Sequence, residues 1–335
     1  MKKAFTLIEL LMVVALIAIV STLAVNRLSG VRESASRKVS LANQKSVERA
    51  VEAFLAEGGR LNRLDSLLYA GAGGAPIFGS SVAGSLDYAN ASDKRSSIGE
   101  DASDADWLYL GPKEDDPNGV YRDQNNSGLT ADLRKLLCKF TLSAAQVSAL
   151  DSRLGLKYVM AHNAYANGYP SVHYPEDRAY GDGTVPNASD GLDPNDSACV
   201  ATLLTNEMVV AAINPMSDLG RTVYQACGQE LMNTKGWGEY YTEDEVKAEL
   251  AANGGVLLAF GLGDSAGIVG KADAGIESAP YATYVQKKYY SRYILLIRLK
   301  TVGSGSVSVI LPEFAGVLDC CGNTIRAAQH IIKRM

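Results

Sequence analysis

The chain begins with an apolar run that is interrupted by a single acid. Residues 5–25, FTLIELLMVVALIAIVSTLAV, are apolar or small hydroxyl residues except for Glu9. A helix rises about 1.5 Å per residue, so this run is close to the length that crosses the hydrocarbon core of a bilayer. A carboxylate at that depth costs about 2.5–3.5 kcal/mol on insertion scales. Glu9 therefore needs a role that offsets this cost.

Two ordinary interpretations leave Glu9 without a role. One is a plain transmembrane anchor, whose cytoplasmic N-terminus Lys2 and Lys3 favour. The other is a secretory signal peptide cleaved after Ala24, at the small residues STLA. An acid within the apolar segment is unfavourable in both cases.

A third interpretation uses the acid. The stretch KKAFTLIELLMVVALIAIV resembles the class III leader of type IV pilins and of type II secretion pseudopilins. The resemblance implies cleavage between Ala4 and Phe5 by a prepilin peptidase, followed by N-methylation of Phe5. It also implies that Glu9 pairs with the terminal amine of a neighbouring subunit during assembly. Such a pairing is physically reasonable, because a buried charge is tolerated when an opposite charge accompanies it.

The pattern after Gly30 changes to an amphipathic helix. Apolar residues recur near helical spacing, and Gly58-Gly59 provides a stop signal. The resulting division is a leader at 1–4, a transmembrane or filament-core helix at 5–29, its amphipathic continuation at 30–57 and an extracytoplasmic head at 58–335. The apolar positions of the continuation are Val39, Val47, Val51, Phe54 and Leu55.

The predicted fold class is α+β and pilin-like. The long N-terminal helix is expected to pack on an antiparallel sheet, with a large, partly helical insertion in the head. Helices are predicted near 129–139, 143–154, 216–232, 242–253 and 323–335, and strands at 107–111, 254–263, 289–300 and 306–311. Residues 70–106 are rich in Gly, Ala, Ser and Asp, which indicates a long surface excursion.

Two acid- and amide-rich segments, 114–126 and 181–196, are candidate calcium loops, because calcium takes six to eight oxygen ligands. Solvated turns are the favoured interpretation of both segments. The first segment resembles an acidic loop element of calcium-binding pseudopilins. The candidate ligands are Asp115, Asp116, Asp123, Asp190, Asp193 and Asp196.

The cysteines form no CxxC pair. Export of the head would permit disulfides, and an odd number of cysteines leaves at least one thiol unpaired within the chain. The adjacent Cys320 and Cys321 are expected to have different partners. The full set of candidates is Cys138, Cys199, Cys227, Cys320 and Cys321.

Composition excludes several function classes. The formal charge is −5, which argues against nucleic-acid binding. No Ser-His-Asp or HExxH order occurs, so we expect no enzyme and no required cofactor.

We expect instead a filament subunit in the inner membrane with an outward head, most simply a type II secretion pseudopilin. Its partners would be other pilin-like subunits, as a homo- or hetero-polymer, the prepilin peptidase and an inner-membrane assembly platform. The alternatives are a type IV pilus subunit for adhesion, motility or DNA uptake, or a secreted or anchored protein.

Overall fold

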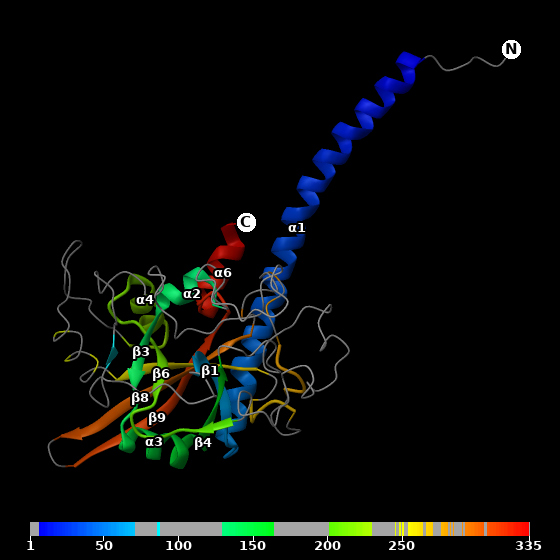
Figure 1. Ribbon diagram of the computed structural model, residues 1–335. Helices are drawn as coiled ribbons and strands as arrows, with labels where there is room; N and C mark the ends of the chain where they lie inside the picture. The colour runs from blue at the N-terminus through cyan, green and yellow to red at the C-terminus, as the bar shows by residue number, and fades with distance from the viewer. Residues whose placement is uncertain are drawn as a thin grey trace.

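The longest element is helix α1 (Leu7–Ala56), which has 50 residues. One half of α1 lies along the head, and the other half extends away from it (Figure 1). The helix ends at glycines: Gly58 has a φ of 85°, and its N–H donates to the Leu55 carbonyl. The N–H of Gly59 donates to the carbonyl of Phe54. This is the Schellman arrangement, so the predicted stop at Gly58-Gly59 is confirmed.

The computed structural model does not describe every residue. For residues 7–30 it describes the backbone alone. The described residues are 7–70, 86–87, 129–163, 201–229, 254–263, 266–270, 276–280, 292–304, 307–334 and the single positions 245, 248, 250, 282, 284 and 290.

The described strands form one mixed sheet of nine. Six of them follow the order β2-β3-β6-β7-β1-β4, with β5 at the end beside β4, and β8 and β9 join on the other edge of β7. Their bounds are β1 (Asn62–Ala70), β2 (Leu86–Asp87), β3 (Leu137–Thr141), β4 (Leu156–Asn163), β5 (Ala201–Leu203), β6 (Val209–Ile213), β7 (Val256–Gly261), β8 (Ile294–Ser304) and β9 (Val307–Leu318). Every pairing is antiparallel except β1 with β4, which is parallel. The expected antiparallel sheet is therefore present with one exception.

Strand β7 is the junction of the sheet. It pairs with β8 from Val256 to Gly261. Its other edge meets two strands in turn, β6 at Leu258 and β1 at Gly261. The residues of β7 from Leu257 onward are buried, as expected of an apolar strand with neighbours on both edges.

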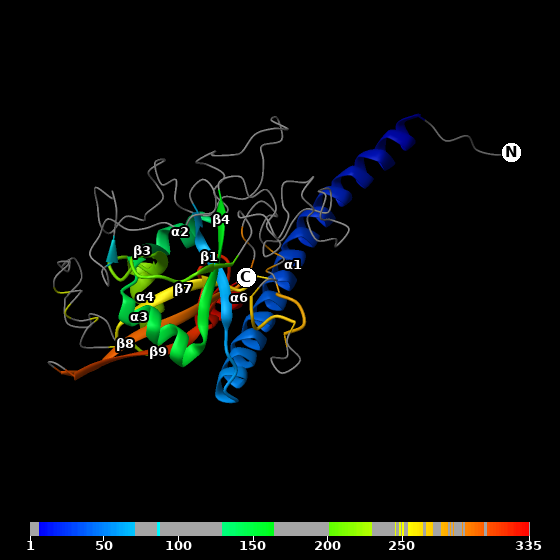
Figure 2. The same cartoon turned by 60° about the horizontal axis from the view of Figure 1, so that its bottom comes forward.

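Strands β8 and β9 form a long hairpin that projects from the head (Figures 1 and 2). The register runs from the pair Ile294–Leu318 to the pair Ser304–Val307. Buried residues dominate the start of β8, whereas Val302 and Val309 face each other near the tip and are exposed. The strands predicted at 254–263, 289–300 and 306–311 are thus confirmed, with shifted ends.

Five shorter helical elements complete the described head: α2 (Ala131–Leu136), α3 (Ala144–Ala149), the π-helical turn η2 (Leu150–Leu154), α4 (Asp218–Ala226) and α6 (Ile325–Arg334). The prediction for 143–154 is confirmed, with a capping box at Ser143 and Gln146. Those for 216–232 and 323–335 are confirmed over shorter ranges. The helix predicted at 129–139 is wrong beyond Leu136, because Leu137–Thr141 is strand β3. The strand predicted at 107–111 lies outside the described residues.

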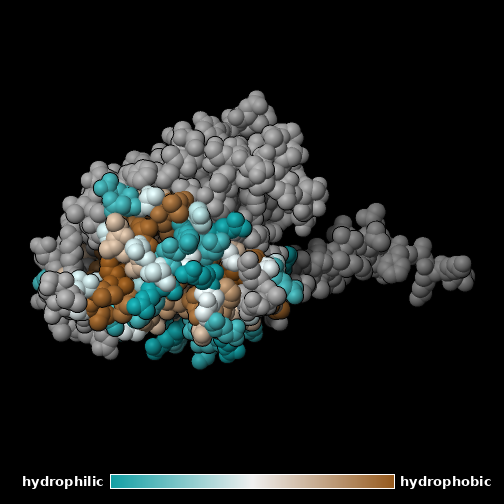
Figure 3. All heavy atoms as spheres, turned by 90° about the horizontal axis from the view of Figure 1, so that it is seen from below, coloured by the Kyte–Doolittle hydropathy of each residue, from teal (hydrophilic) through white to brown (hydrophobic). Residues whose placement is uncertain are grey.

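The hydrophobic core joins α1 to the sheet through residues such as Val51, Leu64 and Leu296, all with no exposed surface. Tyr224, Tyr290 and Tyr293 are among the largest fully buried side chains. The underside of the head, in contrast, shows apolar areas interspersed with polar ones (Figure 3). The fold is therefore a mixed α/β head with one long helix packed on it.

Candidate functional site

The segment predicted to be processed precedes α1 in the sequence. Glu9 belongs to the helical backbone of α1, and its side chain is not among those described. Ala4 and Phe5 lie outside the described residues. The functional geometry that the structure does describe is the contact between α1 and the head, which we call the α1 seat: Arg37, Ser40, Gln44, Val47, Glu48, Val51 and Phe54 with the residues that they contact.

The apolar part of the α1 seat matches the predicted stripe at most positions. Val47, Val51 and Phe54 are buried, and Leu55 packs against the core. Val39 does not belong to it, since 52% of its surface is exposed. The inclusion of Val39 was wrong because positions 47, 51 and 54 define a face that position 39 does not share on a helix of 3.6 residues per turn.

The polar part of the α1 seat was not predicted. Ser40 and Tyr293 of the sheet form two hydrogen bonds: the Tyr293 hydroxyl donates to the Ser40 carbonyl at 2.7 Å, and the two hydroxyl oxygens are 2.9 Å apart. Since the Tyr293 proton is committed to the carbonyl, the Ser40 hydroxyl donates to Tyr293. Burial raises the pKa of Tyr293, so its hydroxyl remains a donor.

Gln44 connects α1 to the end of β9 and to the loop just before α6. Its Nε2 donates to the carbonyl of Val317 at 2.8 Å and to that of Asn323 at 3.0 Å. The side chain is only 1% exposed, and its Oε1 has no hydrogen-bond partner among the described residues. The amide therefore fixes the position of α1 relative to the end of the sheet and to the start of α6.

Glu48 lies one turn further along the same face. Burial, and then the charge of Glu52, raise the pKa of the Glu48 carboxyl, while a hydrogen bond with the backbone of Val317 acts in the opposite direction. Gly316 lets the chain approach here, because a Cβ at this position would lie 3.3 Å from Oε1 of Glu48. Ser40, Gln44 and Glu48 thus recur every four residues, which is the sequence signal that could have revealed this polar stripe.

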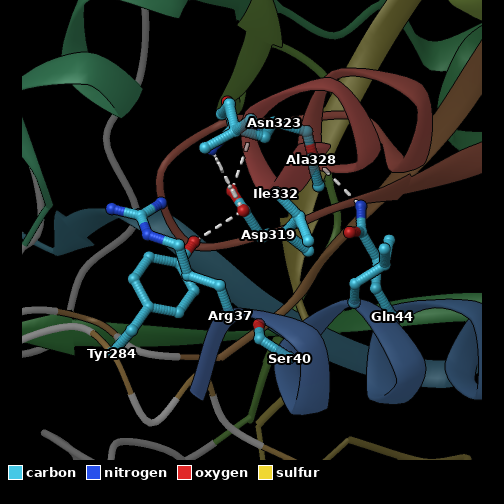
Figure 4. Close-up of a pocket in the computed structure, with 10 residues that line it drawn as sticks. Arg37, Ser40, Gln44, Tyr284, Asp319, Asn323, Ala328 and Ile332 are labelled. Carbon is cyan, nitrogen blue, oxygen red and sulfur yellow. Dashed lines mark hydrogen bonds between the residues drawn. The ribbon is translucent and has the colours of Figure 1, made fainter. Parts of the chain in front are cut away.

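Asp319 organises the loop between β9 and α6 (Figure 4). Its Oδ1 accepts from the N–H groups of Cys321 and Asn323 at 2.9 and 2.8 Å, and its Oδ2 accepts from the Tyr284 hydroxyl at 2.6 Å. Burial, and then the charge of Asp319, raise the pKa of Tyr284, so that it stays a donor.

Arg37 covers this loop from the helix side. Its guanidinium carbon is 4.7 Å from the centroid of the Tyr284 ring, which is a favourable cation–π distance. The same guanidinium pairs with Glu33 on α1 at 3.0 Å. A hollow remains between α1 and α6, and Figure 4 shows Ala328 and Ile332 of α6 opposite Arg37, Ser40 and Gln44. The contacts of this arrangement hold α1 against the loop between β9 and α6.

The candidate calcium ligands Asp115, Asp116, Asp123, Asp190, Asp193 and Asp196 all lie outside the described residues. Within the described part of the chain, no three His, Cys, Asp or Glu residues gather closely enough to hold a metal ion. The calcium loops therefore stay a prediction.

Four of the candidate disulfide cysteines can be placed. Cys138, Cys227, Cys320 and Cys321 carry thiol groups that are not in disulfides in the structure, and Cys199 lies outside the described residues. A hydrogen bond between the neighbouring thiols raises the pKa of Cys320 and lowers that of Cys321. Burial raises the pKa of Cys227 to about 11. Disulfide formation by oxidation stays a prediction.

Comparison with known proteins bears on the N-terminus alone. A family model described as the prokaryotic N-terminal methylation motif matches residues 1–25. No curated protein and no solved structure matches the chain. Of the helical stretches whose side chains the structure describes, none is long and apolar enough to cross a bilayer. The motif implies processing by a prepilin peptidase and assembly with other pilin-like subunits. The chain therefore carries the class III prepilin leader of the type IV pilin and pseudopilin family.

Proposed function

We propose that this chain is a structural subunit of a type IV pilus-like filament, without enzymatic activity, and that it is a pseudopilin of a type II secretion system. The observation that supports this most directly is the methylation motif at residues 1–25, which leads into a single helix of 50 residues. The head holds this helix by its second half, so the first half is available to neighbouring subunits.

In this proposal the prepilin peptidase cuts between Ala4 and Phe5, and Phe5 becomes the methylated terminus. Residues 5–29 anchor the subunit in the inner membrane before assembly, with the head on the outer side. The new terminal ammonium of one subunit pairs with Glu9 of the next. An unpaired carboxylate in an apolar environment is unfavourable in free energy. The pairing removes this penalty only when neighbouring subunits are in the correct register within the filament.

Mass spectrometry of the mature N-terminus tests the processing step. The proposal requires a chain that begins at N-methylated Phe5. A chain that begins at Val25 would instead support the ordinary secretory signal and would refute the filament assignment.

Substitution Glu9→Ala tests the pairing. We expect normal insertion and processing but about a tenfold or greater loss of filament, since a buried ion pair that loses one partner costs about 3–5 kcal/mol. Glu33→Ala, an exposed carboxylate on the same helix, is the matched control and should assemble normally. Normal filament yield with Glu9→Ala would contradict the pairing.

The type IV pilus subunit is the other candidate within the same family. Deletion of the gene separates the two: a secretion pseudopilin leaves exported proteins in the periplasm, whereas a pilus subunit leaves secretion intact and removes surface fibres or the functions that depend on them.

A further inference from the structure

The C-terminal helix α6 runs antiparallel to α1, toward its free half. The start of α6 is fixed at Gln44, whose amide donates to the carbonyl of Asn323. Further along α6, Ile331 and Ile332 line the same hollow as Arg37 and Leu41 of α1. In Figures 1 and 2 the end of α6 accordingly lies beside the middle of α1.

The last turn of α6 is therefore close to the apolar half of α1. Both helices rise about 1.5 Å per residue, so the 11 residues that follow Asn323, ten of them in α6, bring the end of α6 level with about residue 33 of α1. The uncharged run of α1 ends at Asn26, about 10 Å further along. That distance is comparable to one headgroup layer and to the Debye length in physiological salt.

The two helical segments described at this end of the molecule, residues 31–38 and 325–334, are rich in basic residues, although the whole chain has a formal charge of −5. Residues 31–38 contain Glu33 as their single acid, and it is paired with Arg37. Residues 325–334 contain no acid. The exposed cations of the two segments form what we call the basic collar: Arg32, Lys38, Arg326, Lys333 and Arg334.

We infer that the basic collar binds the anionic phospholipid surface of the bilayer in which the subunit is anchored before assembly. This inference rests on the proposed function, because residues 5–29 must be in the membrane for the collar to reach it. Ala328, Ile331 and Ile332 face α1, whereas Arg326 and Lys333 are exposed, so the cationic side of α6 is free to meet lipid headgroups. Binding would hold the head upright on the membrane surface, and extraction into a filament would break these contacts.

The test uses the full chain inserted as single copies into lipid nanodiscs, with the amide hydrogen exchange of residues 325–334 as the readout. One set of discs contains phosphatidylcholine alone, and the other contains equal amounts of phosphatidylcholine and phosphatidylglycerol. We expect exchange of α6 to be slower in the anionic discs by about fivefold or more, since each surface cation near an anionic bilayer contributes roughly this factor. High salt should remove the difference.

Two variants complete the test. The triple substitution Arg326→Gln, Lys333→Gln and Arg334→Gln should abolish the difference between the two lipids. The matched triple Arg49→Gln, Arg60→Gln and Arg153→Gln removes three exposed cations toward the other end of α1 and should retain it. Unchanged exchange in β8 and β9 verifies that each variant is folded.

The inference is overturned if α6 exchanges equally in both lipids while the chain is inserted in both, or if the first triple variant keeps the difference. Slow exchange that arises only in discs with two or more copies would also overturn it, because it would indicate a protein partner. Failure of the chain to insert into either kind of disc would count against the proposed anchor instead, so the two failures are distinguishable.

Discussion

Individual polar side chains decide how α1 is held. Hydrophobic burial at Val47 and Val51 is not directional, and it alone would allow the helix to slide or rotate. The buried hydrogen bonds of Ser40 and Gln44 are satisfied in one arrangement only, because a buried polar group without a partner is costly. These two residues therefore set the register of α1 on the head.

The Tyr293 hydroxyl can be removed with little change in shape. We expect Tyr293→Phe to lower the free energy of unfolding by about 1–3 kcal/mol, because the buried Ser40 carbonyl and hydroxyl both lose this partner. Urea denaturation of the detergent-solubilised chain measures the effect. Tyr158→Phe, which removes the hydroxyl of a partly exposed tyrosine in β4, is the control and should cost much less. Equal costs would contradict this role for Tyr293.

Glu48 gives a prediction about pH. Its pKa is raised from the ordinary value of 4.5 in the folded chain, so ionisation destabilises the fold as the pH rises above that value. We expect Glu48→Gln to be more stable than the natural chain at pH 8, by less than about 1 kcal/mol because half of the group is solvated. At pH 4 the two proteins should be equally stable. Thermal denaturation at both values checks this, and an advantage that is independent of pH would refute it.

Strand β7 pairs with three other strands, β1, β6 and β8. The start of β7 depends on a close contact between its backbone and that of β8. Gly255, just before β7, has a φ of 87°, and a Cβ there would lie 1.7 Å from the Leu299 carbonyl oxygen of β8. Only glycine allows the two strands to approach this closely. The start of the β7–β8 pairing therefore has a steric requirement that its apolar pattern does not reveal.

Gly255→Ala should lower the free energy of unfolding by about 3 kcal/mol or more, because the new methyl group meets backbone that cannot move away without breaking the pairing. Gly228→Ala is the matched control, since Gly228 also has a positive φ, of 77°, but has no atom within 4 Å of the new methyl position. That change should cost about 1 kcal/mol. Chemical denaturation compares the two, and similar costs would show that φ alone matters.

Elements with a strong local pattern were predictable from sequence. The apolar runs of β7 and β8, the amphipathic spacing of α6 and the glycine stop of α1 all depend on neighbours along the chain. Strand β3 was not predictable in this way. Leu137–Thr141 follows a helix directly, and its buried residues are explained by β2 and β6, which pair with it from distant parts of the sequence.

The pairing of β1 with β4 was beyond sequence reasoning for the same reason. It joins Asn62 to Leu156 in parallel across most of a hundred residues, and no local signal sets that register. In the α1 seat, the apolar stripe was predicted, whereas the partners of Ser40 and Gln44 could not be. They lie about 250 and 270 residues away in sequence, at Tyr293 and Val317.

The whole molecule consists of a head and a long helix, α1, of which only the second half lies along the head. Among the side chains that the structure describes, the contacts of α1 with the sheet and with α6 begin near Arg37, and the first half of the helix extends away from the head (Figure 1). We therefore expect the first half of α1 to contribute little to the stability of the head. The same division explains why the sequence motif is confined to the N-terminal part of α1, whereas the packed core is formed by the rest of the chain.

Truncation tests this division. A chain lacking residues 1–30 should be a soluble monomer with a thermal unfolding transition close to that of the full chain in detergent. A chain lacking residues 1–50 should fail to fold, because it loses Ser40, Gln44 and Val47 from the core contact. Circular dichroism and size-exclusion chromatography distinguish these outcomes. A stable head without residues 1–50 would show that the α1 seat is dispensable.

The hydrogen bonds of Ser40 and Gln44 join two successive turns of α1 to the head. A force applied along the free half of the helix would load them together, in shear, instead of peeling them away one after another. A pull that draws α1 out of a bilayer would therefore carry the head with it intact, and a motor acting on the helix alone could move the entire subunit.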